Sequence, residues 1–194
     1  MPKDSALPRL DAQYAFLMEA DRLKTVERAN KLMDRSRFEN SAEHSWHACL
    51  LALLMAPLAS ASVDIDHAIE MLILHDIVEV DAGDHPIHIL YDTAEIQARE
   101  TAAADRIYGL LPTDLARRFR ALWEEFEAMD TPTARFAKAV DYLAPALQSI
   151  GAKLQFDEER EIVAGNLRRG RAVKTKDILP ELFAFTKAAF EGEE

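Results

Sequence analysis

The sequence predicts an all-α protein, and three observations support this fold class. Ala, Leu, Glu and Arg dominate the chain, and these residues favour helix. Glycine is scarce, with 6 residues among 194. Apolar residues recur at spacings of three and four, the period of a helix with one buried face, whereas the alternation typical of β-strands is nearly absent.

Length and composition predict one domain over residues 1–194. Apolar residues make up 49% of the chain, enough for a sizeable core. The formal charge of −11 disfavours binding to a nucleic-acid polymer or to an anionic membrane surface. The single cysteine, Cys49, predicts a chain without an intrachain disulfide. We find neither a secretory leader nor an apolar span of ~20 residues, and therefore expect a cytoplasmic protein without a transmembrane segment.

The first half of the chain is expected to form three helices. Residues 10–26 carry a helical apolar stripe, and we expect the basic segment 28–37 to be a loop or a loosely helical connection. Asn40 begins a capping-box pattern for a helix running to about Pro57, and Asp64 can cap a nearly all-apolar central helix. Large apolar residues predict that the helix after Asn40 lies deep in the bundle: Trp46, Cys49, Leu50, Leu53 and Leu54.

The second half begins with a polar stretch, residues 81–92, which is long enough to form a loop over a pocket. Helices are then expected over about 93–111 and 113–129. Thr131 precedes a proline and marks the start of another helix, which Pro145 should kink or end early.

The last part of the chain is expected to extend this bundle. We expect a core over roughly residues 20–150 and a C-terminal helical extension over 151–194, with a final helix over about 177–190.

Ionisable residues on helices that otherwise look buried are the main functional signal. His75 and Asp76 end the central apolar helix, His44 lies near the start of another, and Asp141 lies beside the apolar stripe of a third. Unpaired charges in a core are costly, and a divalent cation would unite these groups. Imidazole and carboxylate ligands suit Mn, Fe, Co, Ni or Zn. Two His and two Asp leave coordination positions for water and substrate, as catalytic sites do.

Each of these residues also has an ordinary structural explanation. His44 could simply bond nearby polar groups, and Asp141 could be a solvated carboxylate on an acidic protein. His47, one turn after His44, is a rival ligand that we interpret instead as a core histidine or one that supports a ligand.

Two further carboxylates follow the His75-Asp76 pair. On a helix, Glu79 projects toward the same region as this pair and could take or relay a proton. Asp84 comes at the start of the polar loop, where it could orient water or protonate a leaving oxygen. The alternative is an acidic helix end, which the helix dipole mildly disfavours.

The order His44, His75-Asp76, Asp141 resembles the signature of HD-domain metal-dependent phosphohydrolases. Four segments, residues 39–46, 75–84, 122–127 and 134–141, resemble the nucleotidase-type branch of that family. The resemblance implies an HD-type helical bundle with the metal site between central helices. It implies that His44, His75, Asp76 and Asp141 bind one divalent metal and that Glu79 and Asp84 are catalytic.

The similar branch hydrolyses deoxyribonucleoside 5′-monophosphates, often as dimers and with Co or Mn favoured. Its members carry an Arg-Trp pair about fifteen positions before the first ligand histidine, where this chain has Ala29 and Asn30. The nearest basic substitutes are Arg28, Arg35 and Arg37, and we expect Arg35 and Arg37 to bind phosphate. Exposed basic side chains are the alternative interpretation.

The resulting hypothesis is a metal-dependent phosphomonoester hydrolase that acts on nucleoside or deoxynucleoside 5′-monophosphates. Its cofactor would be one divalent ion, with Mn, Co, Ni, Fe, Mg and Zn as candidates. Its partner would be a small phosphate ester, and a homodimer is left open. Two alternatives remain at this point: a non-catalytic metal or nucleotide sensor, and an HD hydrolase of another phosphoester or of a nucleoside triphosphate.

Overall fold

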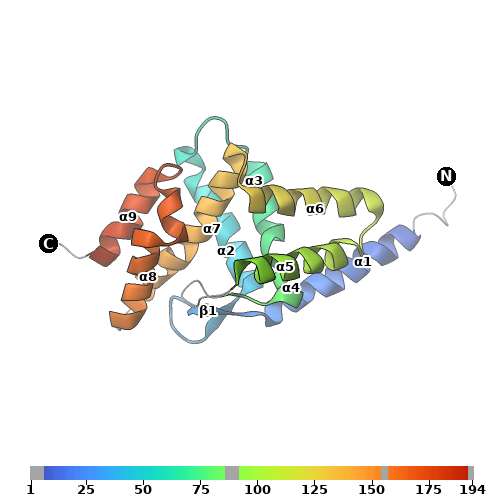
Figure 1. Ribbon diagram of the computed structural model, residues 1–194, viewed down its shortest axis with the longest axis horizontal. Helices are drawn as coiled ribbons and strands as arrows, with labels where there is room; N and C mark the ends of the chain where they lie inside the picture. The colour runs from blue at the N-terminus through green and yellow to red at the C-terminus, as the bar shows by residue number, and fades with distance from the viewer. Residues whose placement is uncertain (1–6, 86–91, 154–156, 192–194) are drawn as a thin grey trace.

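The computed structural model describes residues 7–85, 92–153 and 157–191, and it is a helical bundle with one small two-stranded sheet (Figure 1). The predicted all-α class is confirmed, apart from this sheet. Among the described residues, no helix is long and apolar enough to cross a membrane. The α-helices are α1 Leu7–Asp21, α2 Ser41–Met55, α3 Ile65–Leu74, α4 Glu79–Ala82, α5 Thr93–Tyr108, α6 Thr113–Ala128, α7 Pro132–Gly151, α8 Asp157–Arg169 and α9 Pro180–Glu191.

Helix α7 lies at the centre of the bundle. It packs against α2, α3 and α6, and its C-terminal half packs against α9 and a short 3₁₀ turn, η5 (Arg171–Thr175). In Figure 1 the C-terminal helices α8 and α9 cover one end of α7, whereas α5, α6 and α1 extend from the other side. Phe136, Val140 and Leu143 of α7 are fully buried. The helix therefore joins the C-terminal extension to the central helices in one core.

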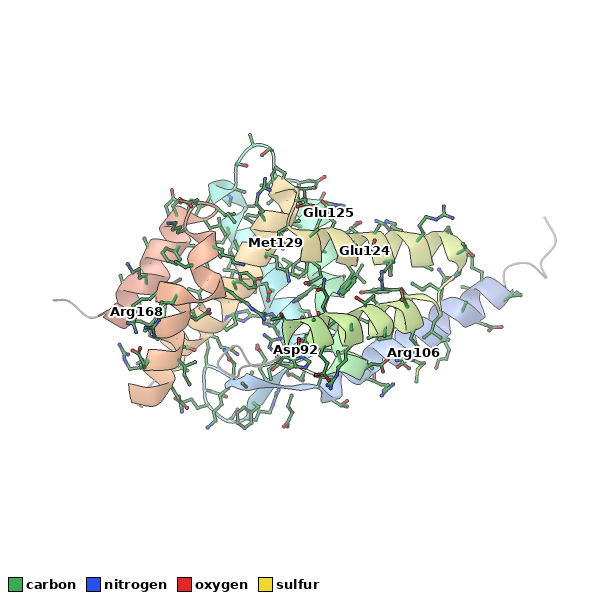
Figure 2. The ribbon with its side chains drawn as sticks, viewed as in Figure 1. Asp92, Arg106, Glu124, Glu125, Met129 and Arg168 are labelled. Carbon is green, nitrogen blue, oxygen red and sulfur yellow. The ribbon has the colours of Figure 1, made fainter. Side chains whose placement is uncertain are left out.

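Helix starts follow the predicted caps. The Asn40 side chain accepts a hydrogen bond from the Glu43 amide at 3.0 Å, and the Glu43 carboxylate accepts one from the Asn40 amide, which completes a capping box before α2. Thr131 Oγ1 accepts from the Ala134 amide at 3.0 Å before α7. Met129 ends α6 in the left-handed conformation with φ 56° (Figure 2).

The segment expected to be a loop over residues 28–37 instead belongs to a β-hairpin. Strands β1 (Glu27–Lys31) and β2 (Phe38–Asn40) pair antiparallel, with Glu27 opposite Asn40. The turn between them passes through Arg35 at φ 62°. The expectation was wrong because this hairpin lies at the edge of the bundle, so its charged side chains show no alternating apolar pattern.

The expectation that α2 is buried around most of its circumference was also wrong. Cys49 is buried as expected, but Trp46, Leu50, Leu53 and Leu54 have exposed fractions of 40% to 62%. The buried face instead carries small residues, such as Ala48 and Ala52, which let α3 and α7 approach closely. The apolar content of α2 predicted a buried helix, but it did not show which face of the helix packs against the core.

The structure decides one expectation about the end of the chain and agrees with another. Of the two alternatives for Pro145, an early end of α7 was wrong, because the helix continues to Gly151. Helix α8 lies in the expected helical extension without having been predicted as a separate helix, and α9 agrees closely with the predicted final helix. The division into a core and a C-terminal extension stays a prediction.

Candidate active site

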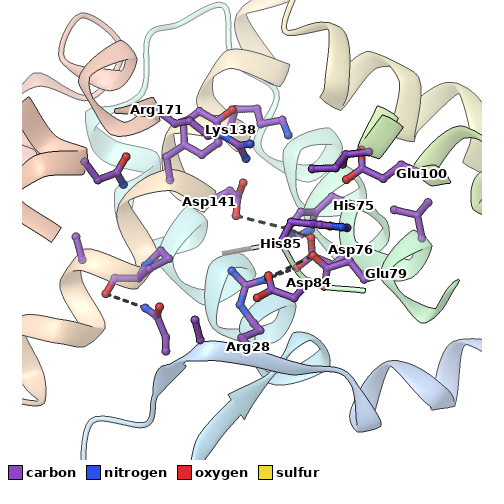
Figure 3. Close-up of a pocket in the computed structure, with 18 of the residues that line it drawn as sticks. Arg28, His75, Asp76, Glu79, Asp84, His85, Glu100, Lys138, Asp141 and Arg171 are labelled. Carbon is purple, nitrogen blue, oxygen red and sulfur yellow. Dashed lines mark hydrogen bonds and ion pairs between the residues drawn. The ribbon is translucent and has the colours of Figure 1, made fainter. Parts of the chain in front are cut away.

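Three elements bring the four predicted metal ligands together. His44 comes from the first turn of α2, Asp141 comes from the middle of α7, and His75 and Asp76 form the start of the 3₁₀ turn η4 (His75–Val78), directly after α3. Figure 3 shows three of them, His75, Asp76 and Asp141. Ligand atoms of His44, His75 and Asp141 lie within 4.8 Å of one another. Asp76 joins them, with Oδ1 at 3.0 Å from His75 Nε2 and Oδ2 at 3.9 Å from His44 Nε2.

The hydrogen bonding of His75 suits a metal ligand. Its Nδ1 lies 2.7 Å from the Leu72 carbonyl oxygen, so Nδ1 donates and Nε2 is the ring nitrogen that faces the cluster, where it could bind a metal once deprotonated. His75 Nε2 is buried without a well-formed hydrogen bond in the described structure. Burial by itself lowers the pKa of His75, but the Asp76 and Asp141 carboxylates outweigh it and raise the pKa to about 10. The cluster thus attracts positive charge, and its donor set fits a divalent cation.

Glu39 supports the other histidine, and sequence reasoning gave it no role. Its Oε2 lies 3.8 Å from His44 Nδ1, and its Oε1 accepts a hydrogen bond from Gln148 Nε2 at 3.0 Å. With 2% of its surface exposed, this carboxylate can orient the His44 ring from behind. The only sequence signal was its place in the segment that resembles the HD family, because β2 is too short to show a burial pattern.

Arg28 is the arginine that reaches the carboxylates. It projects from β1, and its Nη1 lies 3.1 Å from Asp76 Oδ2, 3.6 Å from Asp84 Oδ1 and 3.9 Å from Glu79 Oε1. Its side chain is 14% exposed. Its guanidinium therefore lies beside the metal-ligand cluster and inside the pocket (Figure 3).

Neither of the other two predicted arginines lies in the carboxylate cluster. Arg35 lines the pocket and pairs with Glu159 of α8 at 3.2 Å. Arg37 is exposed, pairs with Glu43 at 2.5 Å and is not among the described residues that line the pocket. The prediction preferred Arg35 and Arg37 because they lie just ahead of Asn40 in the sequence, whereas the structure places Arg28 of β1 at the carboxylates.

The two predicted catalytic carboxylates face the same pocket. Glu79 begins α4 and accepts a hydrogen bond from Ser41 Oγ at 2.5 Å. Gly83, at φ 79°, ends α4 in a conformation that glycine adopts easily and directs the chain to Asp84. Burial, reinforced by the Asp76 charge, raises the pKa of Glu79 well above its ordinary value, although Arg28 opposes this. Burial also raises the pKa of Asp84.

The pocket has a volume of about 880 Å³ and extends well beyond the metal-ligand cluster. It is also lined by Lys138, whose Nζ donates to Glu127 at 2.8 Å and lies 4.0 Å from the centre of the Phe126 ring. Glu100 of α5 also lines it, and burial raises the pKa of Glu100 to about 6. Arg171 lines the side formed by the C-terminal extension (Figure 3). This size suits a small organic ligand.

The remaining histidines fall into different surroundings. His47, the rival ligand, stacks on Trp46 with ring centres 5.9 Å apart. His67 pairs with Glu125 at 2.8 Å, and His85 lines the pocket beside Asp84. His88 lies outside the described residues.

Taken together, the fold and the site define a helical metal-binding protein with acidic residues beside its metal ligands. The model of the HD domain family matches residues 20–183. The chain belongs to the HD domain family.

Three known proteins are similar to this chain. A crystal structure described as a predicted metal-dependent phosphohydrolase from Magnetospirillum magnetotacticum MS-1 is 40% identical, has a TM-score of 0.82 and is matched over 95% of this chain and 94% of its own. The 5′-deoxynucleotidase HDDC2 of Danio rerio is 27% identical over 72% of this chain and 69% of its own length. The human protein of that name is 27% identical over 69% of this chain and 65% of its own length. These matches to the curated relatives span about two thirds of the relatives' length.

Proposed function

We propose that this protein is a metal-dependent phosphohydrolase that converts nucleoside or deoxynucleoside 5′-monophosphates to nucleoside and phosphate. The observation that carries the proposal is the meeting of a His-Asp cluster that could hold a cation, two further carboxylates and one half-buried arginine at a single pocket. Relatives named 5′-deoxynucleotidases support the substrate class.

The cofactor we propose is one divalent ion held by His44, His75, Asp76 and Asp141. Mn, Co, Ni, Fe, Mg and Zn are the candidates, since imidazole and carboxylate ligands suit most of them. When bound, such an ion supplies neutralisation of phosphate charge and activation of water. The family and the His-Asp cluster imply a divalent metal, whereas its identity is for experiment to decide.

The chain's own residues would divide the remaining work. Arg28 would donate hydrogen bonds to phosphate oxygens, because its guanidinium lies among the carboxylates at the cluster and carries a fixed charge. Glu79 and Asp84 would move protons to and from water and the leaving 5′ oxygen, since burial raises both of their pKa values toward neutrality. The expectation that Arg35 and Arg37 bind phosphate stays a prediction.

The test is phosphate release from a panel of substrates. Metal-stripped protein, reloaded with each candidate ion in turn, would be offered nucleoside mono-, di- and triphosphates and unrelated phosphomonoesters. We expect hydrolysis of monophosphates with at least one ion and none without metal. Preferred cleavage of triphosphates would contradict the proposal and favour another HD hydrolase. Ligand binding without any turnover would favour a sensor.

We also propose that the protein forms a homodimer and acts in the cytoplasm. Exposed apolar side chains follow one stripe of α1, at Tyr14, Leu17 and Met18, and another stripe of α2, at Trp46 and Leu50. Exposed apolar patches are typical of contact surfaces. Light scattering coupled to size exclusion would give twice the chain mass of 21.8 kDa for a dimer.

A further inference from the structure

The C-terminal extension forms one wall of the active-site pocket. Ile162, Val163 and Asn166 of α8 line the pocket together with Arg171 of η5, which Figure 3 labels. Glu159 of α8 also lines the pocket, and its carboxylate is paired with Arg35. We name Ile162, Val163, Asn166 and Arg171 the α8–η5 wall. It lies on a part of the chain that contributes none of the proposed metal ligands or catalytic carboxylates, so any role in the reaction must concern the rest of the substrate.

The polar groups of this wall are hydrogen-bond donors without partners. Arg171 has neither an ion pair nor a hydrogen bond to any described residue, whereas two other cations of the pocket, Arg120 and Lys138, are paired with Glu124 and Glu127. The Asn166 carbonyl oxygen accepts from the Ala172 amide at 3.4 Å, which turns its NH₂ group away from that amide. Within the described structure this NH₂ group has no acceptor.

The same wall offers apolar surface. Ile162 is 40% exposed although it lines a pocket, and Val163 beside it is half-buried. Ligand sites combine such surface with a few oriented polar groups. A flat heterocycle placed against Ile162 would lose water from its faces and could present its edge to the donors.

The hydrogen-bond donors of this wall favour a ligand that carries hydrogen-bond acceptors. Guanine, thymine, uracil and cytosine each carry a carbonyl oxygen, whereas adenine carries none and presents an amino donor on its exocyclic position. Arginine pairs well with guanine O6 and N7. An adenine amino group facing Arg171 or the NH₂ group of Asn166 would meet donors only.

We propose that the α8–η5 wall is the nucleobase subsite and that Asn166 and Arg171 select bases with a carbonyl oxygen over adenine. This inference rests on the proposed nucleotidase function. Arg28 and the metal-ligand cluster would hold the phosphate, and the sugar would span the middle of the pocket near Lys138.

Two measurements test the subsite separately from the chemistry. The first compares kcat/KM for the 5′-monophosphates of deoxyguanosine, thymidine, deoxycytidine and deoxyadenosine with metal-loaded protein. The second measures calorimetric binding of the four free nucleosides, which needs no turnover. We expect the three carbonyl-bearing monophosphates to be favoured over the adenine compound by about tenfold or more, which one good set of base contacts provides.

The variants are Arg171→Ala and Asn166→Ala, with Arg169→Ala as the matched control, because Arg169 is exposed on the same segment and does not line the pocket. Each subsite variant should raise KM about tenfold for the carbonyl-bearing substrates and leave the adenine compound within twofold. The control should change nothing. Unchanged thermal unfolding would show that the variants fold.

The outcomes separate the two proposals. Equal turnover of all four monophosphates, or an equal loss for all four in the variants, overturns the subsite and leaves the nucleotidase function standing. Preference for a substrate with a second phosphate that Arg171→Ala removes also overturns it, because Arg171 would then bind phosphate. Base-selective nucleoside binding without turnover overturns the nucleotidase function alone. Neither binding nor turnover overturns both.

Discussion

The two ends of the pocket, the metal-ligand cluster and the α8–η5 wall, differ in how their charged side chains are paired. At the metal end, His44, His75 and Asp76 are buried and Arg28 is half-buried, and each of these side chains lies within 4 Å of an oppositely charged or hydrogen-bonding side chain. At the α8–η5 wall, Arg171 is exposed and unpaired in the described structure. Contacts among the protein's own side chains hold the metal end in place before a substrate binds, whereas the wall keeps hydrogen-bond donors available for a ligand.

This difference separates chemistry from specificity. The family and its solved relative imply the metal-dependent chemistry, and the residues we propose for it lie on β1, α2, η4, α4 and α7 and directly after α4. The wall lies on elements that follow the last proposed ligand in the chain. Substitutions at the metal end should therefore affect every substrate alike, while substitutions at the wall should distinguish between substrates.

The largest expected effect comes from Asp76→Ala. The change removes a carboxylate that contacts both His75 and Arg28, and it should abolish stoichiometric metal binding. We expect kcat/KM to fall by more than about 10³-fold on all substrates, because the electrostatic contribution of a metal is worth several kcal/mol. Metal analysis and phosphate release measure both effects. Asp81→Ala, at an exposed carboxylate paired with Arg106, is the control. Parental turnover in the Asp76 variant would refute the metal-dependent mechanism.

Glu79→Gln should separate binding from turnover at the metal end. The amide keeps the shape and can still contact Ser41, but it cannot accept a proton. We expect metal content and substrate binding to persist while kcat falls by about 10²- to 10⁴-fold. Glu124→Gln, a pocket-lining residue paired with Arg120, should stay close to the parent. A kcat that stays at the parental value in this variant would show that Glu79 does not carry the proton transfer.

Arg28→Ala should weaken the metal end for every substrate without favouring any base. Loss of charge-assisted hydrogen bonds to phosphate typically costs about 1.5–3 kcal/mol, so kcat/KM should fall by roughly 10- to 100-fold. Arg37→Ala removes an exposed arginine outside the pocket and should change kcat/KM less than twofold. Equal effects of the two variants would restore Arg37 as a candidate phosphate ligand. Steady-state kinetics on two monophosphates decides this.

How much the sequence could predict depends on the kind of signal each part carries. His75 and Asp76 were recognisable because charge stands out at the end of an apolar helix, and the structure places them beside His44 and Asp141. Arg28 was not selected because Arg35 and Arg37 lie nearer to Asn40 in the sequence. The contact of Arg28 with the carboxylates depends on how the hairpin of β1 and β2 packs on the helices, and this packing is a tertiary property.

The sequence patterns likewise predicted where helices occur better than they predicted which face of a helix is buried. The capping box before α2 was correctly predicted, because it depends on residues three apart. The inward face of α2 was not, since Ala48 and Trp46 are both apolar and only packing against α3 and α7 decides between them. No sequence motif marks the residues of the α8–η5 wall, so only the structure shows that they line the pocket.

The smallest expected effect concerns Glu100, between the two ends of the pocket. Burial raises its pKa from 4.5 to about 6, so the folded protein binds the proton more tightly than the unfolded chain. Stability from this group is present below about pH 4.5 and is lost as the pH rises through 6. The shift corresponds to at most about 2 kcal/mol, and we expect about 1 kcal/mol because solvent still reaches the carboxyl.

Glu100→Gln should therefore stabilise the protein by about 1 kcal/mol at pH 8, with most of this gain absent at pH 4.5. Urea unfolding at both pH values measures it, and Glu95→Gln on the exposed side of α5 is the control. A gain that is equal at both pH values would show that the carboxyl is as well solvated as a surface residue, and the middle of the pocket would then be as open as the α8–η5 wall.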